Sequence, residues 1–302
     1  MDAQLRTVLA AADWHRLRDA HRERAEGLLA GVAERRRTGR KHPVEDFLFD
    51  YYNLRPGELA SWHPGIGLAL EDPDGDYAGR RFYRHRDGVS TVDAEAFWAK
   101  RSGTVEWTRR LLASTATNQA HFGCFGMHEW AMVYHLQPDQ TRHGYLPLRF
   151  APERVAEVVE QVGLRCSHFD AFRFFTPDAE PLNALRPTRE RQPELDQPGC
   201  LHVGMDLYKW TGKLLPLTDS ALLLDSFELA RDIRELDMRA SAYDLSGWGY
   251  DPVPVETPAG RADYVRRQRT FSDRAAVVRA RLLDVLAHAP GAAEPPAAAL
   301  PS

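Results

Sequence analysis

Apolar positions recur at helical spacing along most of this chain. The segment 4–37 predicts one or two amphipathic helices, because Leu5, Val8 and Leu9 and later Leu28, Leu29 and Val32 fall on one face. Gly39 then provides a natural stop, since glycine readily adopts the left-handed conformation that ends helices. The same periodicity predicts further helices at 43–52, 93–114, 116–136, 151–163, 200–213, 220–239 and 259–288.

In one part of the chain, apolar and polar residues alternate with a period of two instead. Residues 67–70, 80–86 and 89–92 predict strands, and Asp87-Gly88 between the last two predicts a β-turn. The segment 164–183 fits either a strand or a loop followed by a helix, and 186–199 is a polar, proline-bearing loop. We therefore expect a mainly α fold, a single compact helical domain with a small antiparallel β-ribbon.

Three regions follow from this pattern. Residues 1–41 are the N-terminal helices with a basic end, and 42–288 are the helical core domain. The tail 289–302 is rich in proline and alanine, so we expect it to be disordered.

Charge adds one candidate surface. The 302 residues carry a formal net charge of −4, which gives no general attraction to nucleic acid. The densest positive run is Arg35, Arg36, Arg37, Arg40 and Lys41. This run is either a solvated helix end that complements the helix dipole or a local patch that contacts the phosphates of DNA.

The cysteines and the apolar runs indicate where in the cell the protein is located. Cys124, Cys166 and Cys200 are odd in number and lack CxxC spacing, so they predict neither a disulfide framework nor a zinc knuckle. The N-terminus lacks the pattern of a signal peptide, and no apolar run reaches the roughly 18 residues that would span a bilayer. We expect a cytoplasmic protein with no membrane partner.

The segment 118–135 is the strongest indication of a site. Read as a helix, it places His121, His128 and His135 on one face with Met132. A buried face normally avoids groups that need hydrogen-bond partners, so three imidazoles there indicate a built polar site. The alternative is a half-exposed helix with one or two hydrogen-bonded core histidines.

Chemistry-bearing side chains also gather in three other segments. These segments are 42–64, with His42 and Trp62; 165–183, with His168, Asp170 and Arg173; and 199–210, with His202, Asp206 and Lys209. On a helix, His202 and Asp206 point into the same space. Such sets suit metal ligation or acid–base catalysis, and each pair could equally be a buried salt bridge or a helix cap.

Familiar catalytic motifs are absent from this sequence. His128-Glu129 begins like the zinc motif HExxH, but Met132 stands where the second histidine would be. There is no Glu-x-x-His of di-iron bundles, no phosphate-binding loop of the Walker type, no GxGxxG and no GxSxG.

Six stretches together resemble a known family. Residues 42–49, 62–65, 124–134, 197–202, 205–210 and 237–241 are similar to a family, found largely in actinobacteria, that is labelled 3-methyladenine DNA glycosylase. The resemblance covers roughly 40–285. It implies a DNA-repair hydrolase that cleaves the N-glycosidic bond of alkylated purines by base excision and needs no cofactor.

The resemblance also implies roles for individual residues. A carboxylate would stabilise the cationic transition state or activate water, with Asp206, Asp170 and Glu129 as candidates in that order. The histidines His128, His202 and His168 would belong to the catalytic set together with these acids. The extruded base and the DNA phosphates would meet the substrate-binding set Arg173, Lys209, Trp130, Tyr208, His42 and Trp62.

Two other functions stay open at this point. One is a metal-dependent enzyme that acts on a small molecule, in which His128, His168, His202 and Asp206 hold a divalent metal and Glu129 or Asp170 serves as base or support. The other is a nucleic-acid or protein-binding module without catalysis. A binding surface has no need of interior histidines, so the clusters favour an enzyme.

Overall fold

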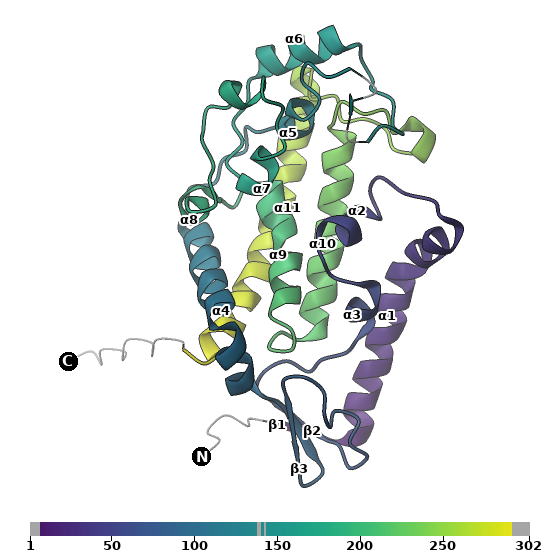
Figure 1. Cartoon of the computed structure of the whole chain (residues 1–302), viewed down its shortest axis with the longest axis vertical. Helices are drawn as coiled ribbons and strands as arrows, with labels where there is room; N and C mark the ends of the chain where they lie inside the picture. Colours follow the sequence, from purple (N-terminus) through teal and green to yellow (C-terminus); the bar gives the residue numbers. More distant parts are fainter. Residues whose placement is uncertain (1–6, 138–139, 142, 292–302) are drawn as a thin grey trace, which may run out of the picture.

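Three long helices packed side by side form the centre of the protein, as the computed structural model shows for residues 7–137, 140–141 and 143–291 (Figure 1). They are α9 (Leu201–Lys213), α10 (Ser220–Arg239) and α11 (Pro258–His288), close to the predicted bounds. α9 and α10 run in opposite directions because a short turn joins them. Their apolar faces supply much of the main core, including Met205, Phe227 and Leu282.

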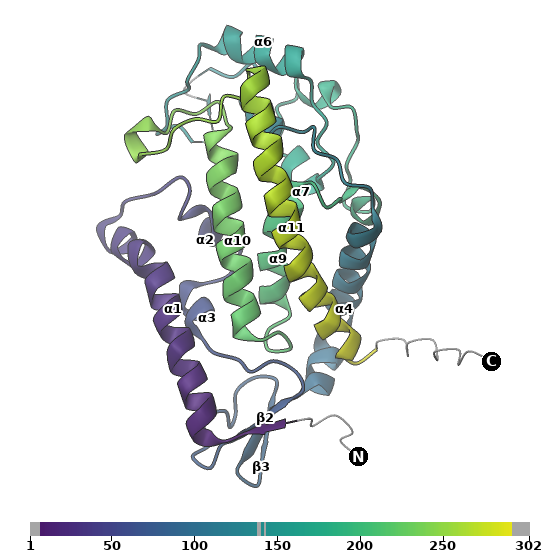
Figure 2. The ribbon, with the colours of Figure 1, turned by 180° about the vertical axis from the view of Figure 1, so that it is seen from behind.

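Two outer helices flank this bundle on opposite sides (Figure 2). α1 (Ala11–Thr38) packs against α10 and the short α3 (Pro56–Ala60), and it ends at Gly39 with a φ of 67°, as predicted. α4 (Ala94–Thr117) packs against α11 and α8 (Gln192–Leu195). The backbone of α4 is kinked at Arg101, where φ and ψ leave the helical region.

A small sheet closes one end of the molecule. The predicted ribbon is confirmed, with β2 (Leu68–Glu71), β3 (Tyr83–Arg86) and β4 (Val89–Val92) in antiparallel register. The sheet also contains β1 (Thr7–Leu9), which pairs in parallel with β2 so that Thr7 lies opposite Leu68. The prediction of helix from residue 4 is therefore wrong for this strand. A separate apolar cluster of Trp14, Trp62, Leu70 and Tyr77 joins the sheet to α1.

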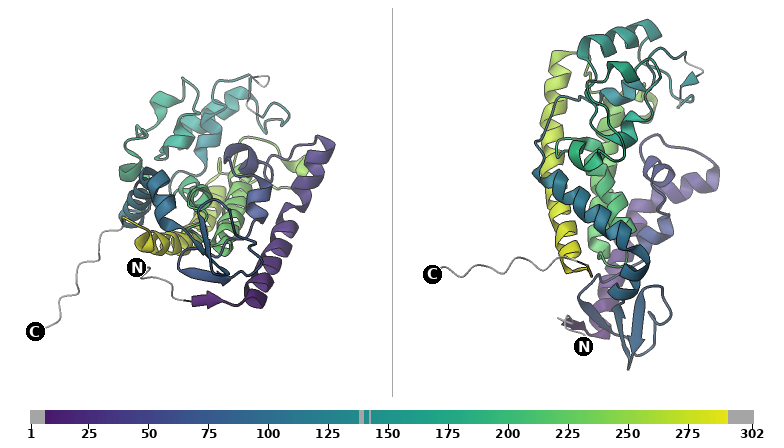
Figure 3. Two further views of the ribbon diagram at one scale, coloured as in Figure 1. Left: turned by 60° about the horizontal axis from the view of Figure 1, so that its bottom comes forward. Right: turned by 60° about the vertical axis from the view of Figure 1, so that its left-hand side comes forward.

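The other end is a layer of short helices and loops (Figure 3). It contains α5 (Met127–Ala131), α6 (Pro152–Val162), α7 (Phe169–Phe172) and the 3₁₀ turns Glu180–Leu182 and Ser246–Trp248. The ambiguous segment 164–183 is thus loop with short helices. α2 (Phe47–Tyr51) begins four residues later than the predicted helix at 43–52.

The predicted helix at 116–136 is wrong. α4 ends at Thr117, a loop follows, and only α5 is helical. Phe125 and Gly126 adopt positive φ values of 48° and 71°, which no α-helix accommodates. His121, His128 and His135 consequently do not share a helix face.

The fold class itself is confirmed: a mainly helical domain with a small four-stranded mixed sheet. None of the described helices is long and apolar enough to cross a membrane. The tail that we expect to be disordered, 289–302, lies almost wholly outside the described residues.

Candidate metal centre

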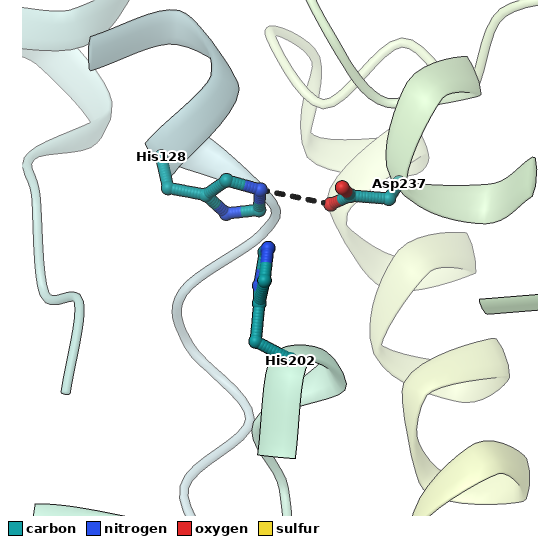
Figure 4. A group of neighbouring side chains, drawn as sticks. All are labelled: His128, His202 and Asp237. Carbon is teal, nitrogen blue, oxygen red and sulfur yellow. Dashed lines mark ion pairs between the residues drawn. The ribbon is translucent and has the colours of Figure 1, made fainter. Parts of the chain in front are cut away.

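Three elements bring His128, His202 and Asp237 together beneath the loop layer (Figure 4). His128 comes from α5, His202 from the first turn of α9 and Asp237 from the last turn of α10. Each offers one ligand atom, and these atoms all lie within 4.8 Å of one another. His128 and Asp237 are buried, and His202 is partly buried.

The contact between His128 and Asp237 is unusual. Nε2 of His128 and Oδ1 of Asp237 form an ion pair at 3.0 Å, but the angles at these two buried atoms are not those of a good hydrogen bond. The ring of His202 points at the space between them, with its centroid 4.3 Å from that of His128 and the rings nearly perpendicular. A separation of about 3 Å is the length of an ordinary hydrogen bond and also the spacing of two ligands at right angles around a metal ion with bonds of about 2.1 Å.

Arg234 holds Asp237 from the other side. Its Nη1 donates to Oδ2 of Asp237 at 3.0 Å and to Oε1 of Glu129 at 2.7 Å. The guanidinium carbon also lies 3.8 Å from the centroid of the Phe47 ring. Arg234 therefore fixes one carboxylate oxygen of Asp237 and leaves Oδ1 facing the two imidazoles.

Burial and charge set the protonation of these groups. Burial lowers the pKa of His202 far below its ordinary value, and the neighbouring charge of His128 lowers it further. Burial also acts to lower the pKa of His128, but the carboxylate of Asp237 outweighs it and the pKa is raised. For Asp237, His128 overcomes the effect of burial, so its pKa is lowered. His202 is thus neutral and Asp237 ionised at physiological pH, the forms that ligate metals. The raised pKa of His128 favours its protonated form, so a metal ion bound at Nε2 would displace that proton.

A second cluster, His168, Asp170 and Asp206, lies beside the first. Here a cation is already in place, because Nζ of Lys209 lies 2.8 Å from Oδ2 of Asp206 and 3.1 Å from Oδ2 of Asp170. Tyr52 donates from its hydroxyl to Oδ1 of Asp206 at 2.8 Å. Lys209 is the main reason why the pKa of Asp206 is lowered despite burial. The second cluster is a satisfied ion-pair network.

His202 connects the two clusters. Its ring is stacked near that of His168, with centroids 5.6 Å apart, and His168 in turn pairs through Nδ1 with Asp196 at 3.0 Å. An unbroken row of imidazoles therefore runs from Asp196 through His168, His202 and His128 to Asp237.

Cavities open on both sides of His202. One, of about 40 Å³, is bordered by His128, Met127 and Tyr264 as well as by all three cysteines of the chain. Burial raises the pKa of each of these cysteine thiols, so they are protonated. The other cavity, of about 20 Å³, is bordered by Glu129, Arg234 and Asp170.

The structure therefore gathers most of the polar residues that the sequence singled out. His128, His202 and Glu129 lie at the first cluster, and His168, Asp170, Asp206, Lys209 and Arg173 at the second. Arg173 contacts Asp170 at 3.2 Å.

The predicted aromatic contacts to substrate lie elsewhere. Trp130 is fully buried and donates to the carbonyl of Ala240, and Tyr208 is packed in the core. Trp62 belongs to the separate cluster next to the sheet. His42 accepts backbone N–H groups of Val44 and Glu45, as a cap does.

The predicted basic run is partly neutralised. Arg35 pairs with Glu45 and Asp46, and Arg37 pairs with Glu34. Arg36 lies over the ring of Phe49. Arg40 and Lys41 are exposed.

Sequence reasoning missed Asp237, Arg234 and Asp196. A signal for Asp237 was present, because it continues the apolar stripe of α10 at the spacing of Ala230 and Ile233. A carboxylate on the buried face of a helix needs a partner, which marks it as a candidate ligand. Asp196 follows α8 in a loop, where no periodicity distinguishes it.

No protein-family model, curated protein or solved structure matches this chain. The resemblance to actinobacterial glycosylases consequently stays a prediction.

Proposed function

We propose that this protein is a metal-dependent enzyme that acts on a small molecule and holds one divalent ion with His128, His202 and Asp237. The observation that carries the proposal is the convergence of three ligand atoms: Nε2 of His128 and Oδ1 of Asp237 form a buried ion pair at 3.0 Å without good hydrogen-bond geometry, and His202 is aimed between them. An ion at that point would satisfy both atoms.

The donor set suits zinc, iron or manganese. Two imidazoles and one carboxylate are common ligands for these ions, and three protein ligands leave coordination positions open. Arg234 would act as the outer support that orients the carboxylate, since it holds the other oxygen of Asp237. Two of the three ligands, His202 and Asp237, come from the packed helices α9 and α10, and His128 comes from the short helix α5 of the loop layer.

The surroundings favour activation of water. The cavity of about 40 Å³ beside His128 and His202 has room for a water molecule. Glu129 and Asp237 carry two negative charges and Arg234 one positive charge, so a divalent ion brings the cluster to a net charge of about +1. That surplus favours binding of an anion such as hydroxide, and an ion at this place would lower the pKa of bound water.

The glycosylase prediction has weaker support in the geometry. Asp206, its first candidate acid, is buried and engaged by Lys209 and Tyr52. Trp130 and Tyr208 are not free to hold a base, because both are core residues. Ion pairs of Arg35 and Arg37 with acids reduce the charge that the end of α1 offers to DNA, although Arg40 and Lys41 stay exposed.

Metal analysis of the full-length protein, purified without a metal-affinity step and incubated with Zn²⁺, Fe²⁺ or Mn²⁺, tests the proposal. We expect about one bound ion per chain and a loss of affinity of more than about tenfold in His128→Ala and Asp237→Ala. His135→Ala is the matched control, because His135 is exposed and pairs with Asp178 away from the centre.

His202→Leu provides a second test of the metal centre in case His128→Ala or Asp237→Ala does not fold. His202 makes no hydrogen bond within the described residues, so its removal leaves no buried partner unsatisfied. A folded His202→Leu protein that retains the metal would overturn the proposal, as would a wild-type protein that binds none of the three ions.

A further inference from the structure

Three cations gather on the surface where the end of α9 meets α4 and the loop before α8. They are Arg101 on α4, Arg189 in the loop and Lys213 at the end of α9. Lys213 borders two recesses at once. The first, of about 330 Å³, also contains Arg101, and the second, of about 240 Å³, contains Arg189. Because they share Lys213, the recesses adjoin.

No carboxylate pairs directly with these three cations in the described part of the chain. Arg24, Arg35 and Arg281 each contact carboxylates on other elements, whereas Arg101, Arg189 and Lys213 form no ion pair within the described residues. Burial lowers the pKa of Lys213, and repulsion from Lys209 and Arg189 lowers it further. Asp206 and Asp170 offset this repulsion in part, and an anion placed among the cations would relieve the remainder.

Two tryptophans, Trp107 and Trp210, form part of the wall of the smaller recess. Trp210 is buried, and the ammonium groups of Lys209 and Lys213 lie 4.7 Å and 5.1 Å from the centre of its ring. Trp107 borders the same recess as Trp210. Cation–π contacts of this kind hold lysine side chains in place. Arg101, at the kink of α4, borders the larger recess.

The larger recess shares two lining residues with an inner cavity. Tyr51 and Asp170 border both this recess and the inner cavity of about 20 Å³ that reaches His202 and Arg234. A molecule held at the surface by the cations would therefore lie next to the inner cavity that borders the candidate metal centre.

We propose that Arg101, Arg189 and Lys213 bind an oxyanion, the phosphate or carboxylate group of a small molecule. A small molecule fits better than a polymer, because the recess has a limited volume and Glu58 and Asp170 interrupt the positive surface. The assignment of this molecule as the substrate rests on the proposed metal centre. The binding of the anion does not.

An NMR titration of metal-free protein with inorganic phosphate and with acetate tests the site. We expect saturating shifts of the indole N–H signals of Trp107 and Trp210, while Trp14, which lies next to the sheet, stays unchanged. Whichever probe binds with the higher affinity, phosphate or acetate, identifies the anionic group of the natural ligand. Absence of saturating shifts with both probes would overturn the proposal.

Charge reversal separates a site from general electrostatics. Lys213→Glu and Arg101→Glu should weaken binding at least about tenfold. Lys41→Glu makes the same charge change at the exposed end of α1 and should leave binding unchanged. Equal weakening by Lys41→Glu would overturn the proposal. Lys213→Gln provides a milder variant if either reversal prevents folding.

A third titration, with a short single-stranded oligonucleotide, distinguishes the class of ligand. Tighter binding of the oligonucleotide than of phosphate, lost in the same variants, would overturn the assignment to a small molecule and favour the glycosylase prediction. A failure of the metal centre would leave all these results unaffected, because no metal is present in the experiment.

Discussion

Lys209 determines how the two neighbouring clusters differ. Both combine imidazole with carboxylate, but in the second cluster an ammonium group lies between Asp170 and Asp206, where an ion would otherwise bind. In the first cluster Arg234 contacts the far oxygen of Asp237 and leaves the near oxygen facing the imidazoles. A single side chain thus leaves one cluster as a candidate metal centre and makes the other an ion-pair network.

Removal of this ammonium group should convert the second cluster into a metal site. In Lys209→Gln we expect bound metal to rise from about one to about two ions per chain, because two carboxylates and His168 lose their cation. Added metal should also raise the melting temperature of this variant more than that of the wild type. Lys213→Gln, one turn further along α9, is the control, since Lys213 contacts no carboxylate. A folded Lys209→Gln protein that takes up no additional ion contradicts this account.

Several residues of the site could be predicted one by one from their neighbours in the sequence. Histidines in apolar surroundings marked His128, His168 and His202, because a buried imidazole needs a partner. Their partners were harder to foresee. Asp237 lies more than a hundred positions after His128, and Asp196 lies in a loop, so only the packing of distant elements reveals either pair.

The loop before α5 is the element that sequence periodicity described least well. Spacing by seven suggested one helix through the three histidines, but Phe125 and Gly126 require positive φ and end any such helix. The loop is held instead by Gln197, which accepts the backbone N–H of His121 at 2.8 Å. Local pattern was a good guide for α9, α10 and α11 because each buries a long, continuous apolar face.

Gly199 allows this loop to approach the start of α9. A Cβ atom at Gly199 would meet the carbonyl oxygen of His121 well inside van der Waals contact. We expect Gly199→Ala to lower the free energy of unfolding by about 1–3 kcal/mol, as measured by urea denaturation.

The control for this change is Gly27→Ala in the middle of α1. No atom lies within 4 Å of a Cβ there, so alanine should raise the free energy of unfolding by about 0.5–1 kcal/mol through its higher helix propensity. If Gly199→Ala proved as stable as Gly27→Ala, the backbone of His121 could not lie as close to Gly199 as the structure shows.

The whole molecule positions the site by joining two kinds of structure. The helical bundle supplies His202 and Asp237 from rigid, buried faces, and the loop layer supplies His128 and the residues of the second cluster that precede α9. The fold class could be predicted because helical periodicity covers most of the chain. The parallel strand β1 could not, because its three residues gain their partner only when β2 lies alongside.

Anomalous X-ray diffraction tests the central claim most directly. Crystals grown with Zn²⁺ or Mn²⁺ and measured at the absorption edge of the metal should show one strong peak at about 2.0–2.3 Å from Nε2 of His128, Oδ1 of Asp237 and a ring nitrogen of His202. A structure without a peak at these three atoms, in which His128 and Asp237 simply hydrogen-bond to each other, would contradict the account.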